Sequence, residues 1–102
     1  MCKLCGLKSD EELQNRLIKD GLDMGNALNH LSIDMAVEQS SDMAKTLYPD
    51  NSVHALVVAY AAYFGWKGMK YETLPSALRA EIFNRIFREI VSQVITGEDD
   101  TH

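Results

Sequence analysis

The sequence predicts an all-α protein, built as a small bundle of four helices, or of five if the second helix is interrupted. Apolar residues recur every three or four positions along most of the chain, which is the period of a helix with one buried face. No segment combines period-two alternation with β-branched enrichment and hairpin turn residues, as strands would. The 102 residues, 46% of them apolar, suit a single helical domain spanning residues 1–102.

The first expected helix spans about residues 10–20. Ser9 and Glu12 have the spacing of a capping box, in which the two side chains bind each other's backbone N–H groups. Gly21 is the expected C-terminal end, because glycine accepts the left-handed cap conformation without strain. The apolar edge of this helix consists of Leu13, Leu17 and Ile18.

A second helix is expected over about residues 22–46, ended by Pro49. Its apolar series steps by four, three and four residues, through Met24, Leu28, Leu31 and Met35. The polar cluster at residues 39–42 can interrupt this helix, because Ser and Asp side chains compete for backbone groups.

A third helix is expected over about residues 52–64, with its N-cap among Asp50, Asn51 and Ser52. It is apolar nearly all round, which places it at the centre of the fold. The uncharged run at residues 55–66 is shorter than the roughly 20 residues that a membrane span needs. A stripe of small residues allows another helix to approach closely, namely Ala55, Ala59 and Ala62.

After a loop at residues 65–73, the fourth helix is expected from Pro75 to about residue 96, with Gly97 just past its end. Glu81, Arg85 and Glu89 are spaced for ion pairs four residues apart. Residues 97–102 form an acidic tail that we expect to fray. Two apolar ridges line the helix, one made of Leu78, Ile82, Ile86, Ile90 and Val94, the other of Phe83, Phe87, Val91 and Ile95.

Cys2 and Cys5 form a CxxC motif in an N-terminal segment, residues 1–8, that we expect to be flexible. The motif supplies half of the four ligands of a structural zinc site, and His30, His54 or the same motif of a second chain could complete it. A redox role is disfavoured because the motif neither opens a helix nor follows a strand. The simplest interpretation is a flexible segment that holds two thiols and no metal, so we expect no cofactor, with zinc as the alternative.

A polar ridge with a four-residue step is formed by His30, Asp34, Glu38 and Asp42. Such a set can bind metal when several helices contribute, but the solvated face of the second helix is the favoured interpretation. His54, at the start of the third helix, is interpreted as a structural residue in preference to a ligand or a pH switch.

Several functional classes are disfavoured. Ten basic residues against fifteen acidic ones give a net charge of −5, which does not suit binding to a phosphate backbone. No nucleophile elbow, phosphate loop or dinucleotide motif is present, so we expect no enzymatic activity. No apolar stretch of signal-peptide length follows the N-terminus, so a cytoplasmic protein without a membrane span is expected.

The apolar helical surface exceeds what so short a chain can bury alone. We therefore expect a small protein-interaction module (an adaptor, regulator or inhibitor) that binds another protein and forms a homodimer or larger homo-oligomer. The alternatives are a zinc-tethered regulator using Cys2 and Cys5 and a helical nucleic-acid-binding regulator. Aromatic residues and Met are enriched at protein interfaces, so the predicted partner-binding residues are Tyr63, Trp66, Met69, Tyr71, Phe83 and Phe87.

Overall fold

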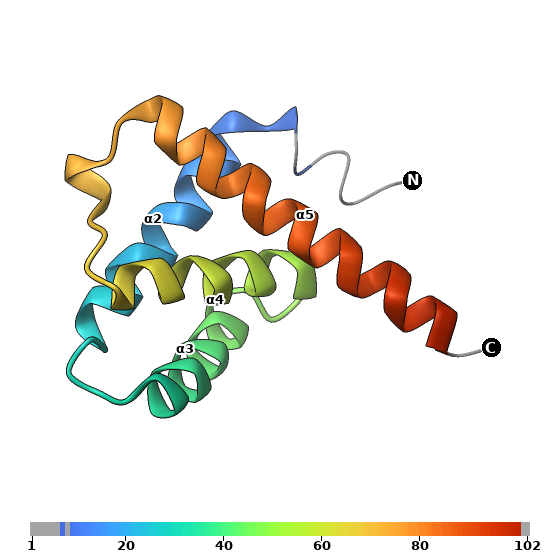
Figure 1. The fold of residues 1–102 in the computed structure, drawn as a ribbon, viewed down its shortest axis with the longest axis horizontal. Coiled ribbons are helices and arrows are strands. Elements are labelled where there is room, and N and C mark those ends of the chain that lie inside the picture. The colour runs from blue at the N-terminus through green and yellow to red at the C-terminus, as the bar shows by residue number, and fades with distance from the viewer. Residues whose placement is uncertain (1–6, 8, 101–102) are drawn as a thin grey trace.

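The computed structural model describes residues 7 and 9–100 (Figure 1). This part of the chain contains no strand, and the all-α prediction is confirmed. Its elements, in chain order, are α2 (Glu11–Ala27), α3 (Ile33–Leu47), α4 (Ser52–Trp66), the short 3-10 helix η1 (Tyr71–Thr73) and α5 (Ser76–Asp100).

Helix α2 begins and ends later than expected. Its N-cap is Asp10, whose carboxylate accepts a hydrogen bond from the backbone N–H of Leu13 at 3.0 Å. The expected end at Gly21 is wrong, because the helix continues to Ala27. Gly21 is buried inside the helix, where its missing side chain lets α4 come close.

The long second helix expected over residues 22–46 is also wrong, since the chain reverses between α2 and α3. Ser32 caps α3 by accepting from the N–H of Met35 at 3.4 Å. The indole Nε1 of Trp66 donates to the carbonyl of Leu31 at 2.9 Å and ties the reversal to the end of α4. The suspected interruption at residues 39–42 is absent, because buried Ser40 donates its hydroxyl hydrogen to the Val37 carbonyl within the helix.

Helix α4 lies at the centre of the fold, as its apolar sequence predicts. Asn51 caps it by accepting from the N–H groups of Val53 and His54, both at 3.1 Å. The helix packs against α2, α3 and α5 (Figure 1). Its buried residues are Ala55, Val57, Val58, Ala61, Ala62 and Gly65.

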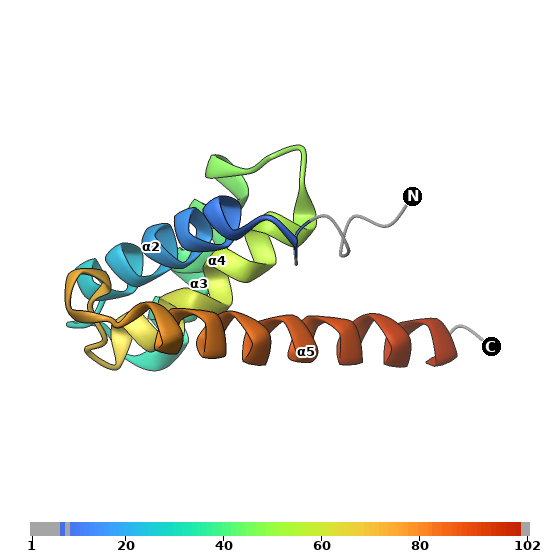
Figure 2. The ribbon, with the colours of Figure 1, turned by 90° about the horizontal axis from the view of Figure 1, so that it is seen from above.

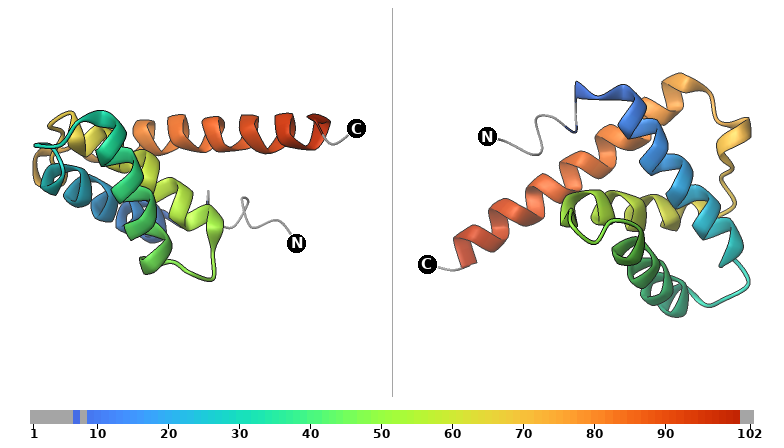
Figure 3. Two further views of the ribbon diagram at one scale, coloured as in Figure 1. Left: turned by 90° about the horizontal axis from the view of Figure 1, so that it is seen from below. Right: turned by 180° about the vertical axis from the view of Figure 1, so that it is seen from behind.

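Helix α5 runs along one side of the other three helices, and its C-terminal turns extend beyond them (Figures 2 and 3). It begins one residue after Pro75, whose carbonyl accepts from the N–H of Arg79 at 3.0 Å. The expected end near residue 96 is wrong, because the helix passes through Gly97 to Asp100. Its buried inner face consists of Ile82, Phe83, Ile86 and Ile90.

Leu7 belongs to the core, with 2% of its surface exposed, and the Nε2 amide of Gln14 donates to its carbonyl at 3.4 Å. The segment expected to be flexible therefore does not include Leu7. Cys2 and Cys5 lie outside the described residues.

Helices α2 and α4 cross at closely packed small residues. A Cβ atom on Gly25 would lie 2.5 Å from the backbone nitrogen of Trp66, and one on Gly65 would lie 2.8 Å from the Cα of Leu22. The amide of Asn26 closes the end of this crossing, because its Nδ2 faces the carbonyls of Leu22, Gly65 and Met69 at 2.9, 3.0 and 2.9 Å. Three backbone acceptors from two distant segments thus converge on one side chain.

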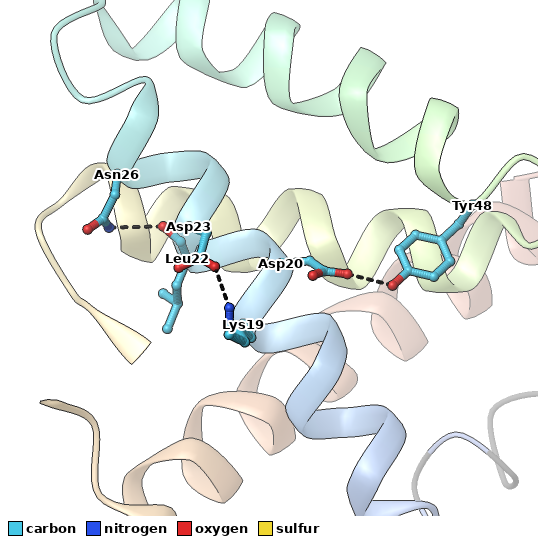
Figure 4. Close-up of polar contacts among 6 residues, drawn as sticks. All are labelled: Lys19, Asp20, Leu22, Asp23, Asn26 and Tyr48. Atoms are coloured by element: carbon cyan, nitrogen blue, oxygen red, sulfur yellow. Dashed lines mark hydrogen bonds and ion pairs between the residues drawn. The ribbon is translucent and has the colours of Figure 1, made fainter. Parts of the chain in front are cut away.

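A tyrosine–carboxylate bond joins the segment after α3 to α2. The hydroxyl of Tyr48 donates to the Asp20 carboxylate at 2.6 Å (Figure 4). Burial, followed by this hydrogen bond, raises the pKa of Tyr48 to about 12. Because the folded-state pKa lies above the ordinary value of about 10, the contribution of Tyr48 to stability is complete below pH 10 and is lost as the pH rises through 12.

Tyr48→Phe is expected to lower the free energy of unfolding by about 1 kcal/mol at neutral pH. The difference between wild type and variant should vanish between pH 10 and pH 12, since the ionised phenol no longer donates to Asp20. Urea denaturation of both proteins across this pH range measures the difference in stability. The lysines and other tyrosines that titrate in this range are present in both proteins, so their effect cancels in the comparison. Parallel pH profiles of the two proteins would contradict the assignment.

Candidate functional site

An apolar groove of about 510 Å³ lies between α3, α4 and α5. Helix α4 contributes half of its lining residues, and α3 and α5 contribute its walls. The apolar lining residues are Val37 on α3, Leu56, Ala59 and Phe64 on α4, and Ile86 on α5. A groove of this size and lining suits the apolar face of a ligand or of another chain.

The groove exists because α4 has no polar side. Ala61 and Gly65 face α2, whereas Leu56 and Tyr63, seven residues apart, lie on the opposite side of the helix. Helices α3 and α5 cover that side only in part, so Leu56 remains 40% exposed and Tyr63 41% exposed. A helix that is apolar all round, with incomplete cover, leaves an apolar surface accessible.

Helix α3 carries exposed apolar residues both at the groove and elsewhere on its surface. The inner face of this helix is formed by small residues, Ala36, Ser40 and Ala44, which are buried. Its large apolar side chains remain exposed, with Val37 at the groove edge 49% accessible. The other exposed apolar residues on α3 are Ile33, Met35, Met43 and Leu47.

Arg85 and Glu89 carry opposite charges on the α5 wall of the groove, one helical turn apart. Both side chains are exposed. The ion pairs expected among Glu81, Arg85 and Glu89 are absent from the described part of the chain. The ion pair found there joins Lys19 and Asp23 at 2.9 Å (Figure 4). Arg85 and Glu89, which form the charged rim of the groove, therefore have no ionic partner within the described chain.

Aromatic contacts hold the groove residues of α4 in place. The Tyr63 ring stacks on Trp66 with centroids 6.4 Å apart, and the Lys67 ammonium lies 5.1 Å from the Tyr63 centroid. At the other end, the Nε2 amide of Gln93 on α5 donates to the hydroxyl of Tyr60. These contacts order the groove without any bound partner, which lowers the entropic cost of binding.

The predicted partner-binding residues divide between surface and core. Tyr63 lines the groove and Trp66 stacks beside it. Phe83 is 1% exposed and packs beside Phe87, so Phe83 is a core residue that no partner reaches in this fold.

The two loop residues in that set lie away from the groove. The Met69 carbonyl accepts from Asn26. The Tyr71 ring lies 5.0 Å from the Arg79 guanidinium. Both residues hold the connection between α4 and α5 in place.

Sequence reasoning missed Val37, Leu56, Arg85 and Glu89 as site residues. Leu56 belongs to the helix that was expected at the centre of the fold because it is apolar nearly all round. The sequence did contain a signal for an accessible side of this helix. A helix that is apolar all round can remain partly uncovered when only three amphipathic helices pack against it.

Asp34, Glu38 and Asp42 are exposed on α3, opposite its buried small residues, whereas His30 lies in the preceding turn. In the described ranges, no group of three or more His, Cys, Asp or Glu residues is arranged to hold a metal. His54 packs edge-on against the Tyr48 ring with centroids 5.7 Å apart. Cys2 and Cys5, the predicted zinc ligands, are not among the described residues.

None of the described helices has both the length and the apolar character to cross a membrane. No protein-family model, curated protein or solved structure shows significant similarity to this chain. Its function therefore has to be inferred from the geometry of the groove.

Proposed function

We propose that this chain is a small non-enzymatic protein-interaction module whose α3–α4–α5 groove receives the apolar face of another polypeptide. The observation that carries the proposal is that exposed apolar side chains from two helices, Val37 on α3 and Leu56 on α4, line the same groove. An apolar groove with accessible apolar side chains is typical of an interaction site.

The composition of the groove supports a protein partner. Tyrosine and arginine, the residue types enriched at energetically important interface positions, are both present in Tyr60, Tyr63 and Arg85. An apolar space between helices suits an amphipathic helix, which binds through apolar side chains spaced three and four residues apart. The module would act in the cytoplasm as an adaptor, regulator or inhibitor by occupying its partner's apolar face.

Leu56→Asp is expected to reduce binding of partner proteins at least about tenfold, because it places a carboxylate in the apolar lining of the groove. Val37→Asp, on the α3 wall of the groove, should reduce binding by the same amount. Both side chains are exposed, so the fold should tolerate the changes. Quantitative pull-down from the source organism, with mass spectrometry of the recovered proteins, measures the loss.

The matched control is Met35→Asp. Met35 is 51% exposed on the same helix as Val37 but does not line the groove. Unchanged circular dichroism would show that all three variants are folded. Equal recovery of partners by the groove variants and by Met35→Asp would contradict the proposed function.

A further inference from the structure

We infer that the polypeptide covering the groove is a second copy of this chain, related by a two-fold axis, with Arg85 of each copy facing the partner's Glu89. This inference rests on the proposed function and names the groove's partner. It depends on the charge order along the groove rim and on the apolar character of the surface beside it.

The charge order on the rim is self-complementary. Arg85 and Glu89 lie one turn apart on the same wall, carry opposite charges and make no ion pair in the described part of the chain. A two-fold axis that lies beside this turn and perpendicular to α5 reverses the direction of the partner's α5. Each positive group then meets a negative one, and the pairing occurs twice.

The apolar surface fits the same arrangement. In a two-fold contact the same patch is present on both sides, so an apolar centre is covered by an apolar centre. Leu56 and Val37, 40% and 49% exposed, lie at the groove beside the α5 wall that carries Arg85 and Glu89. Docking a second copy buries these side chains while the polar rim pairs outside them, as in a standard interface with an apolar core and a polar rim.

The two opposite charges on the rim also reduce the electrostatic repulsion between two copies of the chain. Each chain carries a net charge of −5, so two copies repel each other at long range. A rim with only one sign of charge would add to that repulsion, whereas Arg85 and Glu89 offset it locally. Like-charge juxtaposition at an interface is costly, and the two-fold arrangement avoids it.

The test uses two charge reversals, Arg85→Glu and Glu89→Arg, studied separately and as an equimolar mixture. The wild type should sediment at twice the 11.5 kDa mass of the chain. Each variant alone places two like-charge pairs in the contact, and its dimer dissociation constant should rise at least about tenfold. In the mixture, the acid at position 85 of one variant faces the base at position 89 of the other, so a heterodimer of near wild-type affinity should form.

The mixture shows whether the charges act between chains or within one helix. Each variant chain still carries two like charges at positions 85 and 89, so opposite charges can pair only between two chains. Matched controls are Arg88→Glu and Glu81→Arg, which reverse exposed charges on α5 that do not line the groove. These controls should leave the dimer unchanged.

Two results would overturn this inference and leave the proposed function standing. The first is a wild type that is monomeric at about 0.1 mM while Leu56→Asp still abolishes capture of other proteins. The second is a dimer that the reversals do not weaken or that the mixture does not restore. A monomer whose captured proteins are unaffected by Leu56→Asp would overturn both proposals.

Discussion

Gly25→Ala is expected to lower the free energy of unfolding by about 3 kcal/mol or more. The added Cβ would lie within 3 Å of three backbone atoms of α4, among them the nitrogen of Trp66 at 2.5 Å and the carbonyl carbon of Gly65 at 2.8 Å. Backbone atoms inside a helix cannot move individually, so the two helices would have to separate. The packing of the buried residues on both sides of the crossing would weaken with them.

The expected change in the free energy of unfolding is opposite in sign to the change at an ordinary helical position. In an ordinary exposed helix position, glycine to alanine stabilises by about 1 kcal/mol. Urea denaturation of the two proteins gives the difference directly. A stability equal to or above wild type would show that α2 and α4 do not cross as closely as described.

Gly68→Ala is the matched comparison. Gly68 has a φ of 106°, and a Cβ there would meet no atom within 4 Å. Its replacement should cost only the strain of a left-handed alanine, about 1 kcal/mol. The larger loss at Gly25 therefore measures the steric contact between the helices.

Asn26→Asp is expected to destabilise the protein by about 3 kcal/mol or more at neutral pH. The amide Nδ2 of Asn26 faces the carbonyl oxygens of Leu22, Gly65 and Met69 (its contact with Leu22 is drawn in Figure 4). A carboxylate has nearly the same shape but only accepts hydrogen bonds. Three acceptors would then face a negative charge in a partly buried site.

Comparison with Asn26→Ala tests the reason for the effect. Alanine removes the donor without adding a charge and should cost about 2 kcal/mol. If shape alone mattered, aspartate would be the milder change, so a less destabilising Asn26→Asp would contradict the prediction. Asn84→Asp, at an exposed position on α5, serves as the control and should be nearly neutral.

The stability variants and the binding variants affect opposite sides of α4. Gly25 and Asn26 act where α2 crosses the helix, whereas Leu56 and Tyr63 lie in the groove. Changes in the groove can therefore be interpreted as effects on binding, and changes at the crossing as effects on folding.

Local chemistry explains which elements were correctly predicted. The third predicted helix, over about residues 52–64, begins where α4 begins because Asn51 caps it, and α4 continues two residues further because Gly65 packs against α2 inside the helix. Ser40, suspected of interrupting α3, satisfies its hydroxyl on the Val37 carbonyl and leaves the helix intact. In the groove, Tyr63 was identified from its residue type, but Phe83 belongs to the core because its side of α5 faces inward.

The helical class, the central place of α4 and the excess of apolar helical surface could all be predicted from the order of the amino acids. These follow from periodicity, capping residues and composition, which act over a few residues. Three features could not be predicted in this way. The chain reverses before Ile33, Gly21 and Gly25 lie within a helix, and Leu56 remains accessible beside Arg85 and Glu89. Each of these features depends on contacts between residues that are distant along the chain, such as Trp66 with Leu31 and Gly25 with α4. A local sequence pattern does not specify which faces of the helices pack together.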